Sequence, residues 1–276
     1  MEHNNRLLCT GDPILDIYIG KDGSMRHFNG GALNIYQNTL ALLEHFCLQL
    51  RMFPNNLQFA YPSDGDFIKG DIFNCYTICR TPLHPDGIPL AEQATKDIFY
   101  SPCGIAEMII EFKPDILVLG DYDKGSLNDS DEIITELPDI KYGIVDSRYR
   151  SLDLRWLDTC KYKLWHATGE EYNEKWAKNF DIVFWTNGPE DVIVLKHGKQ
   201  IAKLPVPKET QVLNTCGSGD TFTATIAACL YAYDNVSISS LADYAKYAIE
   251  VCQDVVSQPY TSTTNKRIRE ECLSQT

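Results

Sequence analysis

The sequence predicts an α/β protein in which a mostly parallel sheet is covered by helices on both faces. From about residue 103 onward, short apolar segments alternate with amphipathic ones, as in strand–helix–strand units. The 276 residues suffice for one α/β domain with a large core, so a single domain over 1–276 is expected. Gly, Asp and Asn gather directly after the predicted strands, at the edge where parallel sheets bind ligands.

The first part of the chain predicts two strands, one helix and an irregular insertion. Residues 6–10 form a short apolar run that ends in Gly-Asp-Pro, which is typical of a buried strand, and 14–19 alternates as a half-buried strand does. Apolar residues recur at spacings of three and four over 32–46, which indicates an amphipathic helix. Five prolines interrupt 50–100, where the expected strand covers 72–80, so we predict a small sheet or lid there rather than a core layer.

The remainder of the chain supplies most of the predicted sheet. Strands are expected at 115–120, 142–146, 162–166, 181–185, 191–196 and 200–205, and helices at 103–112, 129–136, 170–178, 219–232 and 238–256. The last two strands flank His197-Gly198-Lys199, which predicts a hairpin.

Composition argues against several classes of protein. The 25 basic and 38 acidic residues give a net charge of −13, which disfavours nucleic-acid binding because that binding depends on neutralising phosphates. The sequence lacks an apolar run of about 18 residues and the residue order of a signal peptide, so we expect a cytoplasmic location and no membrane contact. Ten scattered cysteines without a CxxC pair predict free thiols rather than disulfides or a zinc site.

Residues 214–220, Asn-Thr-Cys-Gly-Ser-Gly-Asp, carry the strongest signal for chemistry. Gly217, Ser218 and Gly219 precede an acidic residue that opens an apolar helix. Small residues allow close approach of the backbone to a ligand, and a helix N-terminus offers unpaired N–H groups to an anion. Asp220 at this place is either a plain helix cap or a base that accepts a hydroxyl proton during phosphoryl transfer.

Several segments, in order along the chain, resemble one family of enzymes. Residues 214–220 resemble the DTxGAGD signature of the ribokinase/PfkB carbohydrate kinases, and 11–18 and 30–34 are similar to the GDxxLDxY and GGAxN segments of that family's sugar site. Three further segments are similar to the SDYxKG, VDPK and TRGExG segments of heptose 7-phosphate kinases, the kinase half of ADP-heptose synthase: 119–125, 145–148 and 186–191. Together the matches span residues 7 to about 262, nearly the whole chain.

The resemblance implies a three-layer αβα ribokinase-like fold with a small β lid, whose elements would fall within about 17–29 and 65–100. It implies an ATP-dependent phosphotransferase that acts on a hydroxyl of a sugar or sugar phosphate, with a heptose 7-phosphate 1-kinase-like activity favoured. The implied cofactors are ATP and Mg²⁺, while a monovalent cation such as K⁺ and a homodimer stay open. The expected partner is a small sugar.

The resemblance also assigns roles to residues. Asp220 matches the catalytic base, and Gly217, Ser218 and Gly219 match the anion hole. The matching substrate positions are Asp12, Asp16, Gly30, Gly31, Asn34, Asp121 and Lys124, the last as a group that neutralises phosphate. The nucleotide side would hold Thr186, Gly188, Asn214 and Arg148, and Glu171 is the matching acidic residue of the NxxE segment that helps to hold Mg²⁺.

Departures from the family pattern keep two alternatives open. Asn214 stands where the family has Asp, Thr168 stands where NxxE begins with Asn, and 18–30 is short for the expected lid strands. One alternative is a non-catalytic sugar or nucleotide sensor on the same fold, and the other is a kinase for a nucleoside or a vitamin-like alcohol. The scattered histidines, His166 among them, predict structural or surface roles.

Overall fold

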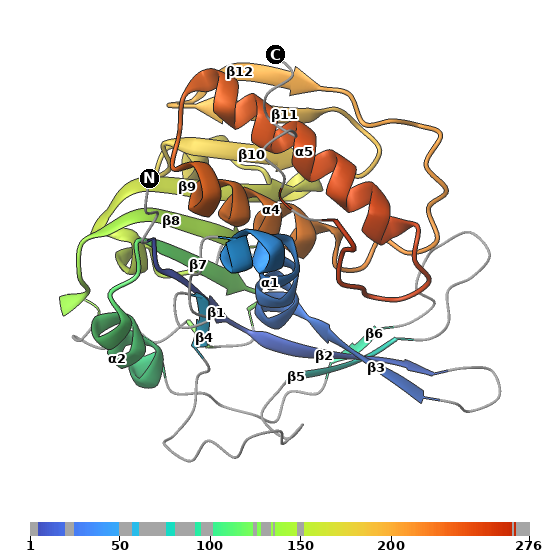
Figure 1. Cartoon of the computed structure of the whole chain (residues 1–276), viewed down its shortest axis with the longest axis horizontal. Coiled ribbons are helices and arrows are strands. Elements are labelled where there is room, and N and C mark those ends of the chain that lie inside the picture. Colours follow the sequence, from blue (N-terminus) through green and yellow to red (C-terminus); the bar gives the residue numbers. More distant parts are fainter. Residues whose placement is uncertain are drawn as a thin grey trace.

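An eight-stranded sheet forms the centre of the protein (Figure 1). The computed structural model describes residues 5–19, 25–49, 57–60, 76–80, 92–94, 102–123, 126–127, 134, 136–147, 152–266 and 268. In spatial order the strands are β12 (Lys199–Leu204), β11 (Val192–Lys196), β10 (Ile182–Thr186), β9 (Cys160–Thr168), β8 (Ile140–Ser147), β7 (Ile116–Asp121), β1 (Leu7–Gly11) and β4 (Leu57–Ala60). Neighbouring strands from β4 to β10 pair in parallel, whereas β11 pairs antiparallel with both β10 and β12. The predicted mostly parallel sheet is confirmed.

Helices cover both faces of this sheet, as Figure 1 shows. The helices α1 (Gly31–Gln49), α4 (Ser218–Tyr233) and α5 (Ile238–Val256) pack on one face, while α2 (Pro102–Phe112) and the 3₁₀ turn η4 (Leu154–Leu157) pack on the other. Successive residues of a strand point to opposite faces, so Leu7 and Cys9 enter the first core and Leu8 enters the second. These two cores make the three layers that the sequence predicts.

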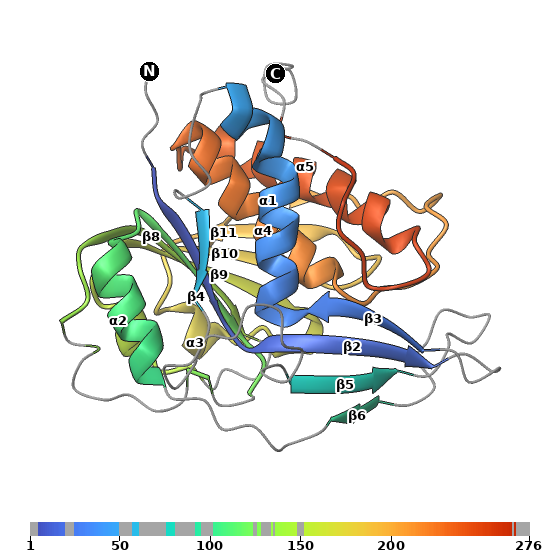
Figure 2. The same cartoon turned by 60° about the horizontal axis from the view of Figure 1, so that its bottom comes forward.

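A second, four-stranded sheet extends from the carboxyl end of β1 (Figure 2). Its strands, in spatial order, are β3 (Met25–Gly30), β2 (Pro13–Ile19), β5 (Tyr76–Arg80) and β6 (Glu92–Ala94). The chain passes from β1 to β2 at Gly11, where φ is +126° and a Cβ atom would lie 2.1 Å from the carbonyl oxygen of Gly120. Only glycine fits such a close approach, so this residue determines where the second sheet departs from the first.

Most predicted elements agree with the structure. The hairpin lies at β11 and β12, and the last two helices are α4 and α5. No helix in the described part of the chain is both long and apolar enough to cross a membrane. The predicted helix at 129–136 falls largely outside the described residues.

Two predictions are wrong in detail. The helix expected at 170–178 is divided into the 3₁₀ turn η5 (Gly169–Glu171) and the short α3 (Glu174–Ala177). The division occurs because Asn173 is extended and its side chain accepts a hydrogen bond from the N–H of Trp176, which starts a new helix. Residues 57–60, expected in an insertion outside the core layer, pair with β1 as the edge strand β4 of the main sheet.

Candidate active site

The site is centred on the start of α4, at the carboxyl edge of the main sheet. Gly217 is the N-cap of this helix and has a φ of +79°, a conformation that favours glycine. A Cβ atom at Gly217 would lie 2.6 Å from Nδ2 of Asn34, so the loop packs closely against α1. Because Gly217 occupies the cap, Asp220 is not the helix cap, and its carboxylate is directed to partners from other segments.

Asp220 is buried, with 6% of its surface exposed. Nδ2 of Asn34 donates to Oδ2 of Asp220 at 2.9 Å, and the hydroxyl of Tyr122 donates to Oδ1. Burial and the neighbouring carboxylate of Asp146 raise the pKa of Asp220 to about 7, against the effect of these two hydrogen bonds; Asp16 adds to the rise. A carboxyl group with a pKa near neutrality suits a general base, because it both accepts and releases a proton at neutral pH.

Asp12 holds the loop that presents Tyr122. Oδ2 of Asp12 accepts a hydrogen bond from the backbone N–H of Tyr122 at 2.7 Å, and Oδ1 accepts one from the N–H of Ser126 at 3.0 Å. Burial and the surrounding carboxylates raise the pKa of Tyr122 well above its usual value, so the phenol stays protonated and remains a donor to Asp220. Both carboxylate oxygens of Asp12 thus bind the loop, a role that the resemblance did not assign to it.

The remaining polar residues predicted for the substrate meet where β2, β3 and α1 join. Asp16 is buried, and its Oδ2 accepts a hydrogen bond from Oγ1 of Thr261 at 2.7 Å. A Cβ atom at Gly30 would lie 2.8 Å from the same oxygen, and Gly31 has a φ of +55°, so these glycines allow β3 to turn into α1 beside the carboxylate. Asn34, one turn further along α1, connects this group to the start of α4.

The first turn of α4 presents backbone donors. The N–H of Ser218 donates to the carbonyl of Thr215 at 3.2 Å and that of Thr221 to Gly217 at 2.9 Å, whereas no described residue accepts a hydrogen bond from the N–H of Gly219 or Asp220. Unpaired N–H groups at a helix N-terminus favour an anion. A Cβ atom at Gly219 would lie 3.5 Å from the nearest protein atom outside the helix, so the protein leaves room on this side of the turn.

A buried histidine joins α4 to three strand ends. Oγ1 of Thr223 donates to Oδ2 of Asp146 at 2.9 Å, and Nδ1 of His166 forms a hydrogen bond with the same hydroxyl, also at 2.9 Å. Nε2 of His166 forms a hydrogen bond with Oγ1 of Thr186 at 2.9 Å. The ring also stacks on Phe222 of α4, with centroids 4.8 Å apart. Thr186, predicted for the nucleotide side, is thereby connected to the helix that carries Asp220.

Three predicted residues have their side chains engaged in bracing contacts. Asp121 accepts from Oγ of Ser147 at 2.7 Å, which ties the ends of β7 and β8 together. Oδ1 of Asn214 accepts from the N–H of Cys216 at 2.9 Å, and Oγ of Ser218 donates to the carbonyl of Thr215 at 2.9 Å. The Asn214 and Ser218 contacts stabilise the loop before α4.

Other predicted residues are not brought to Asp220 by any described contact. Gly188 lies in an exposed turn after β10 with a φ of +56°, and Glu171 is half-buried in η5. Lys124 and Arg148 lie outside the described residues.

The donors and acceptors present fit a nucleotide better than a metal ion held by protein alone. The N–H groups of Gly219 and Asp220 suit a phosphate. Among the described residues, no three His, Cys, Asp or Glu side chains gather into a metal site. Mg²⁺ in nucleotide-binding proteins is usually held by one or two carboxylates together with the phosphates, and Glu171 is the candidate carboxylate here.

Comparison with known proteins supports the fold described above. Residues 163–267 match the family model of pfkB family carbohydrate kinases. Arabidopsis thaliana ribokinase, solved with ribose and ATP, aligns with 99% of this chain and 99% of its own at 15% identity and a TM-score of 0.61. The chain has a ribokinase-like fold.

Two other ribokinase-like structures align with 98% of this chain and 97% of their own, each at 14% identity. They are a fructokinase variant from Vibrio cholerae O395 with fructose, ADP and K⁺, at a TM-score of 0.62, and Escherichia coli phosphofructokinase-2 with K⁺, at 0.64. At these identities the likeness establishes the fold, and it does not identify a substrate. A search of curated proteins finds no match.

Several residues of the candidate site were not assigned a role from the sequence. They are Tyr122, Asp146, His166, Thr223 and Thr261. Tyr122, Asp146 and His166 follow or end predicted strands, so their position at the sheet edge was a usable signal. Thr223 and Thr261 lie within a helix and after one, where the sequence offers no comparable indication.

Proposed function

We propose that this protein is an ATP-dependent carbohydrate kinase that transfers the γ-phosphoryl group of ATP to a hydroxyl of its acceptor. The observation that carries the proposal is the position of Asp220. Its buried carboxylate, with a pKa of about 7, lies in the same helical turn as backbone N–H groups that have no described acceptor. A proton acceptor beside an anion site is what phosphoryl transfer to an alcohol requires. The family match over 163–267 supports this reading of the geometry.

Each residue of the site would have its own role in the reaction. The acceptor hydroxyl donates its proton to Asp220 as its oxygen bonds to the γ-phosphorus, and the bond from that phosphorus to the bridging oxygen of ADP breaks. The N–H groups of Gly219 and Asp220 and the positive end of α4 stabilise charge on the transferring group. Asn34 and Tyr122 orient the carboxylate. Mg²⁺, which Glu171 would help to hold, would neutralise phosphate charge.

The choice of acceptor is the finer part of the proposal. In this proposal Asp16, which contacts Thr261, and Asn34, which contacts Asp220, bind hydroxyl groups of a sugar. The segments at 119–125 and 145–148 that resemble heptose 7-phosphate kinases make heptose 7-phosphate one acceptor to test beside unphosphorylated sugars. K⁺ is a further component to vary, because the fructokinase and phosphofructokinase-2 structures that align with this chain contain it.

The test is an acceptor panel assayed for ADP release, with the product identified by mass spectrometry. The panel contains ribose, fructose, fructose 6-phosphate, heptose 7-phosphate and adenosine, each with ATP and Mg²⁺, with and without K⁺. We expect at least one acceptor to gain a phosphoryl group in an amount equal to the ADP formed. If no member of a wide panel is phosphorylated while several bind, the protein is a sensor and the kinase proposal is wrong.

A further inference from the structure

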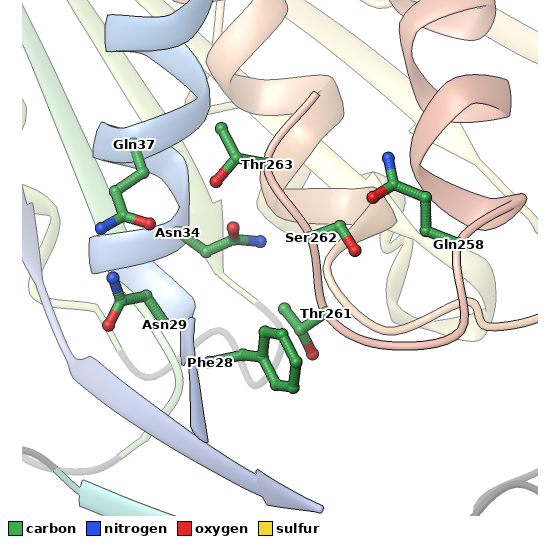
Figure 3. A pocket seen from close by; sticks show the side chains of 8 residues that line it. All are labelled: Phe28, Asn29, Asn34, Gln37, Gln258, Thr261, Ser262 and Thr263. Atoms are coloured by element: carbon green, nitrogen blue, oxygen red, sulfur yellow. The ribbon is translucent and has the colours of Figure 1, made fainter. Parts of the chain in front are cut away.

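The segment that follows α5 is fastened to α1 beside the candidate active site. Figure 3 shows Asn34 of α1 and residues 261–263 of this segment on two sides of a pocket of about 230 Å³. Directly after these residues, the backbone N–H of Thr264 donates to Oδ1 of Asn38 on α1 at 2.9 Å. Asp254, near the end of α5, accepts a hydrogen bond from Oγ1 of Thr264 at 2.9 Å. Contacts to α1 and to α5 therefore hold Thr264 in place.

Two backbone groups determine which way round the carboxamide of Asn38 lies. The N–H of Thr264 can only donate, so the atom that faces it must be the oxygen Oδ1. The backbone carbonyl of Asn34 can only accept, and Nδ2 of Asn38 donates to it at 3.0 Å. A reversed carboxamide would bring two donors together at one contact and two acceptors at the other. Asn38 is buried with 0% of its surface exposed, so such a mismatch would be costly.

The fixed carboxamide of Asn38 orients the carboxamide of Asn34 in turn. Nδ2 of Asn38 also donates to Oδ1 of Asn34 at 2.9 Å. The oxygen of the Asn34 side chain is thereby turned toward Asn38, and its other end, Nδ2, donates to Oδ2 of Asp220 at 2.9 Å. Three hydrogen bonds thus run in one direction, from the backbone of Thr264 through two buried carboxamides to the proposed base.

The direction of these bonds matters because Asp220 has two protonation states near neutral pH. Burial and the carboxylate of Asp146 raise its pKa to about 7. A protonated carboxyl group is a donor, so a carboxamide that was free to turn would present its oxygen to this group and favour the protonated form. A carboxamide that is held presents only its donor, which favours the ionised form. The ionised form is the one that accepts a proton from a hydroxyl.

We propose that Asn38 is a positioning residue, which together with the backbone N–H of Thr264 holds the donor of Asn34 toward Asp220 and so favours the ionised carboxylate. The inference rests on the proposed function, because it assigns Asn38 a role through the base of that reaction. Asn38 acts through Asn34, and the segment after α5 contributes to the site through a backbone group.

The titratable side chains around Asp220 and its partners come from elements other than α1. They are Asp12, Asp16, Tyr122, Asp146 and His166. Asp146 and Asp16 raise the pKa of Asp220, whereas the hydrogen bonds from Tyr122 and Asn34 lower it. A change at Asn38 removes none of these groups, so a shift in the pKa of Asp220 reports the orientation of Asn34.

The experiment measures the pKa of Asp220 by NMR in protein labelled with ¹³C at Cγ of aspartate. The Asp220 signal is identified by its absence in Asp220→Asn. Asn38→Ala removes the carboxamide from the helix, and a water molecule in its place both donates and accepts, so it does not fix Asn34. Thr39→Val is the matched control, because Thr39 is also fully buried on α1 and its hydroxyl donates to the carbonyl of Ile35 at 2.9 Å.

We expect Asn38→Ala to raise the pKa of Asp220 by roughly half to one unit, since part of the donor's effect on a charged group is lost. With an acceptor that is phosphorylated, kcat well below this pKa should then fall roughly three- to tenfold, while kcat above about pH 9 should not change. Thr39→Val should lower the melting temperature and leave the pKa of Asp220 as in the wild type.

A second measurement uses the wild type and decides the matter if Asn38→Ala does not fold. In protein labelled with ¹⁵N-asparagine, the side-chain N–H signals of Asn34 are identified by their loss in Asn34→Ser. These signals should shift with the same midpoint as the carboxyl signal of Asp220. Signals that stay constant through that titration would overturn the inference, because the donor of Asn34 would then not face Asp220.

The outcomes separate this inference from the proposed function, because NMR needs no turnover. If the pKa of Asp220 rises in Asn38→Ala but no acceptor is phosphorylated, the inference about Asn38 holds and the kinase proposal fails. If an acceptor is phosphorylated and the pKa of Asp220 in folded Asn38→Ala equals that in Thr39→Val, or is lower, the inference fails and the kinase proposal holds.

Discussion

Removing the hydroxyl of Tyr122 should make the activity of the protein require a higher pH. In the structure this hydroxyl donates to Oδ1 of Asp220, and the hydrogen bond lowers the pKa of a carboxyl that burial otherwise raises. Tyr122→Phe deletes the donor and keeps the ring, so the pKa of Asp220 should rise above its value of about 7. The base must be ionised to accept a proton, so the pH below which kcat falls should rise by the same number of pH units.

The size of the shift follows from the strength of the lost interaction. A hydrogen bond to a charged group contributes about 1.5–3 kcal/mol, and one pKa unit corresponds to about 1.36 kcal/mol. Since water or a small movement replaces part of the lost bond, we expect a shift of roughly one pH unit. For a group with a pKa near 7, that shift reduces the ionised fraction at pH 7 by about fivefold, and the effect should vanish well above pH 8.

The assay is kcat from ADP release between pH 5.5 and 9.5 at saturating ATP and acceptor. Tyr142→Phe is the matched control, because Tyr142 also donates to a carboxylate, Oδ1 of Asp234 at 3.0 Å, away from the candidate site. The kcat of Tyr142→Phe should fall at the same pH as that of the wild type. If Tyr122→Phe melts normally and its kcat falls at the same pH as that of the wild type, or at a lower pH, the phenol of Tyr122 does not lower the pKa of Asp220.

Three further predictions concern the same site. Gly217→Ala should lower the melting temperature and nearly abolish activity, since the φ of Gly217 is +79° and the new Cβ would lie 2.6 Å from Asn34. Gly219→Ala should melt as the wild type does, and equal destabilisation by both changes would contradict this packing. Asp16→Ala should raise the acceptor KM far more than the ATP KM, because we propose that Asp16 binds the acceptor, and equal changes of both KM values in steady-state kinetics would contradict that assignment. Asp220→Asn should stabilise the fold relative to wild type, and the gain should grow from about pH 4 to pH 7. The pKa of Asp220 is raised from 3.8 to about 7 in the folded protein, so ionisation of this carboxyl opposes folding in that pH range. Urea unfolding in which the gain does not depend on pH would contradict the raised pKa.

The sequence predicted the fold well because its signals were local and repeated. The strands and helices after residue 103 have clear apolar periodicity, and each is bounded by turn residues, so the mostly parallel sheet covered by helices followed from their alternation. The errors occurred where a single side chain or a distant partner decides the structure. Asn173 restarts a helix by capping it, and residues 57–60 become a strand only because β1 offers them a free edge.

The candidate site was predictable in its glycines and acidic residues but not in its network. Asp220 and Asn34 were identified separately, and only the fold brings them to 2.9 Å. The placement of Asp12 differed most from expectation, because both of its oxygens bind the backbone of the loop that carries Tyr122. Such a role depends on the path of a loop more than a hundred positions away, which no local pattern encodes.

The most direct test of the kinase account is the activity of Asp220→Asn with the acceptor that the panel identifies. This change is nearly isosteric, and Asp220 is not the cap of α4, so the fold should survive. Asp243 is a half-buried residue of α5, and Asp243→Asn serves as the matched control that should retain wild-type turnover. Loss of a general base should reduce kcat by roughly 10²–10⁴-fold with modest change in either KM. A kcat for Asp220→Asn within about threefold of wild type would contradict the account, because the base would then lie elsewhere.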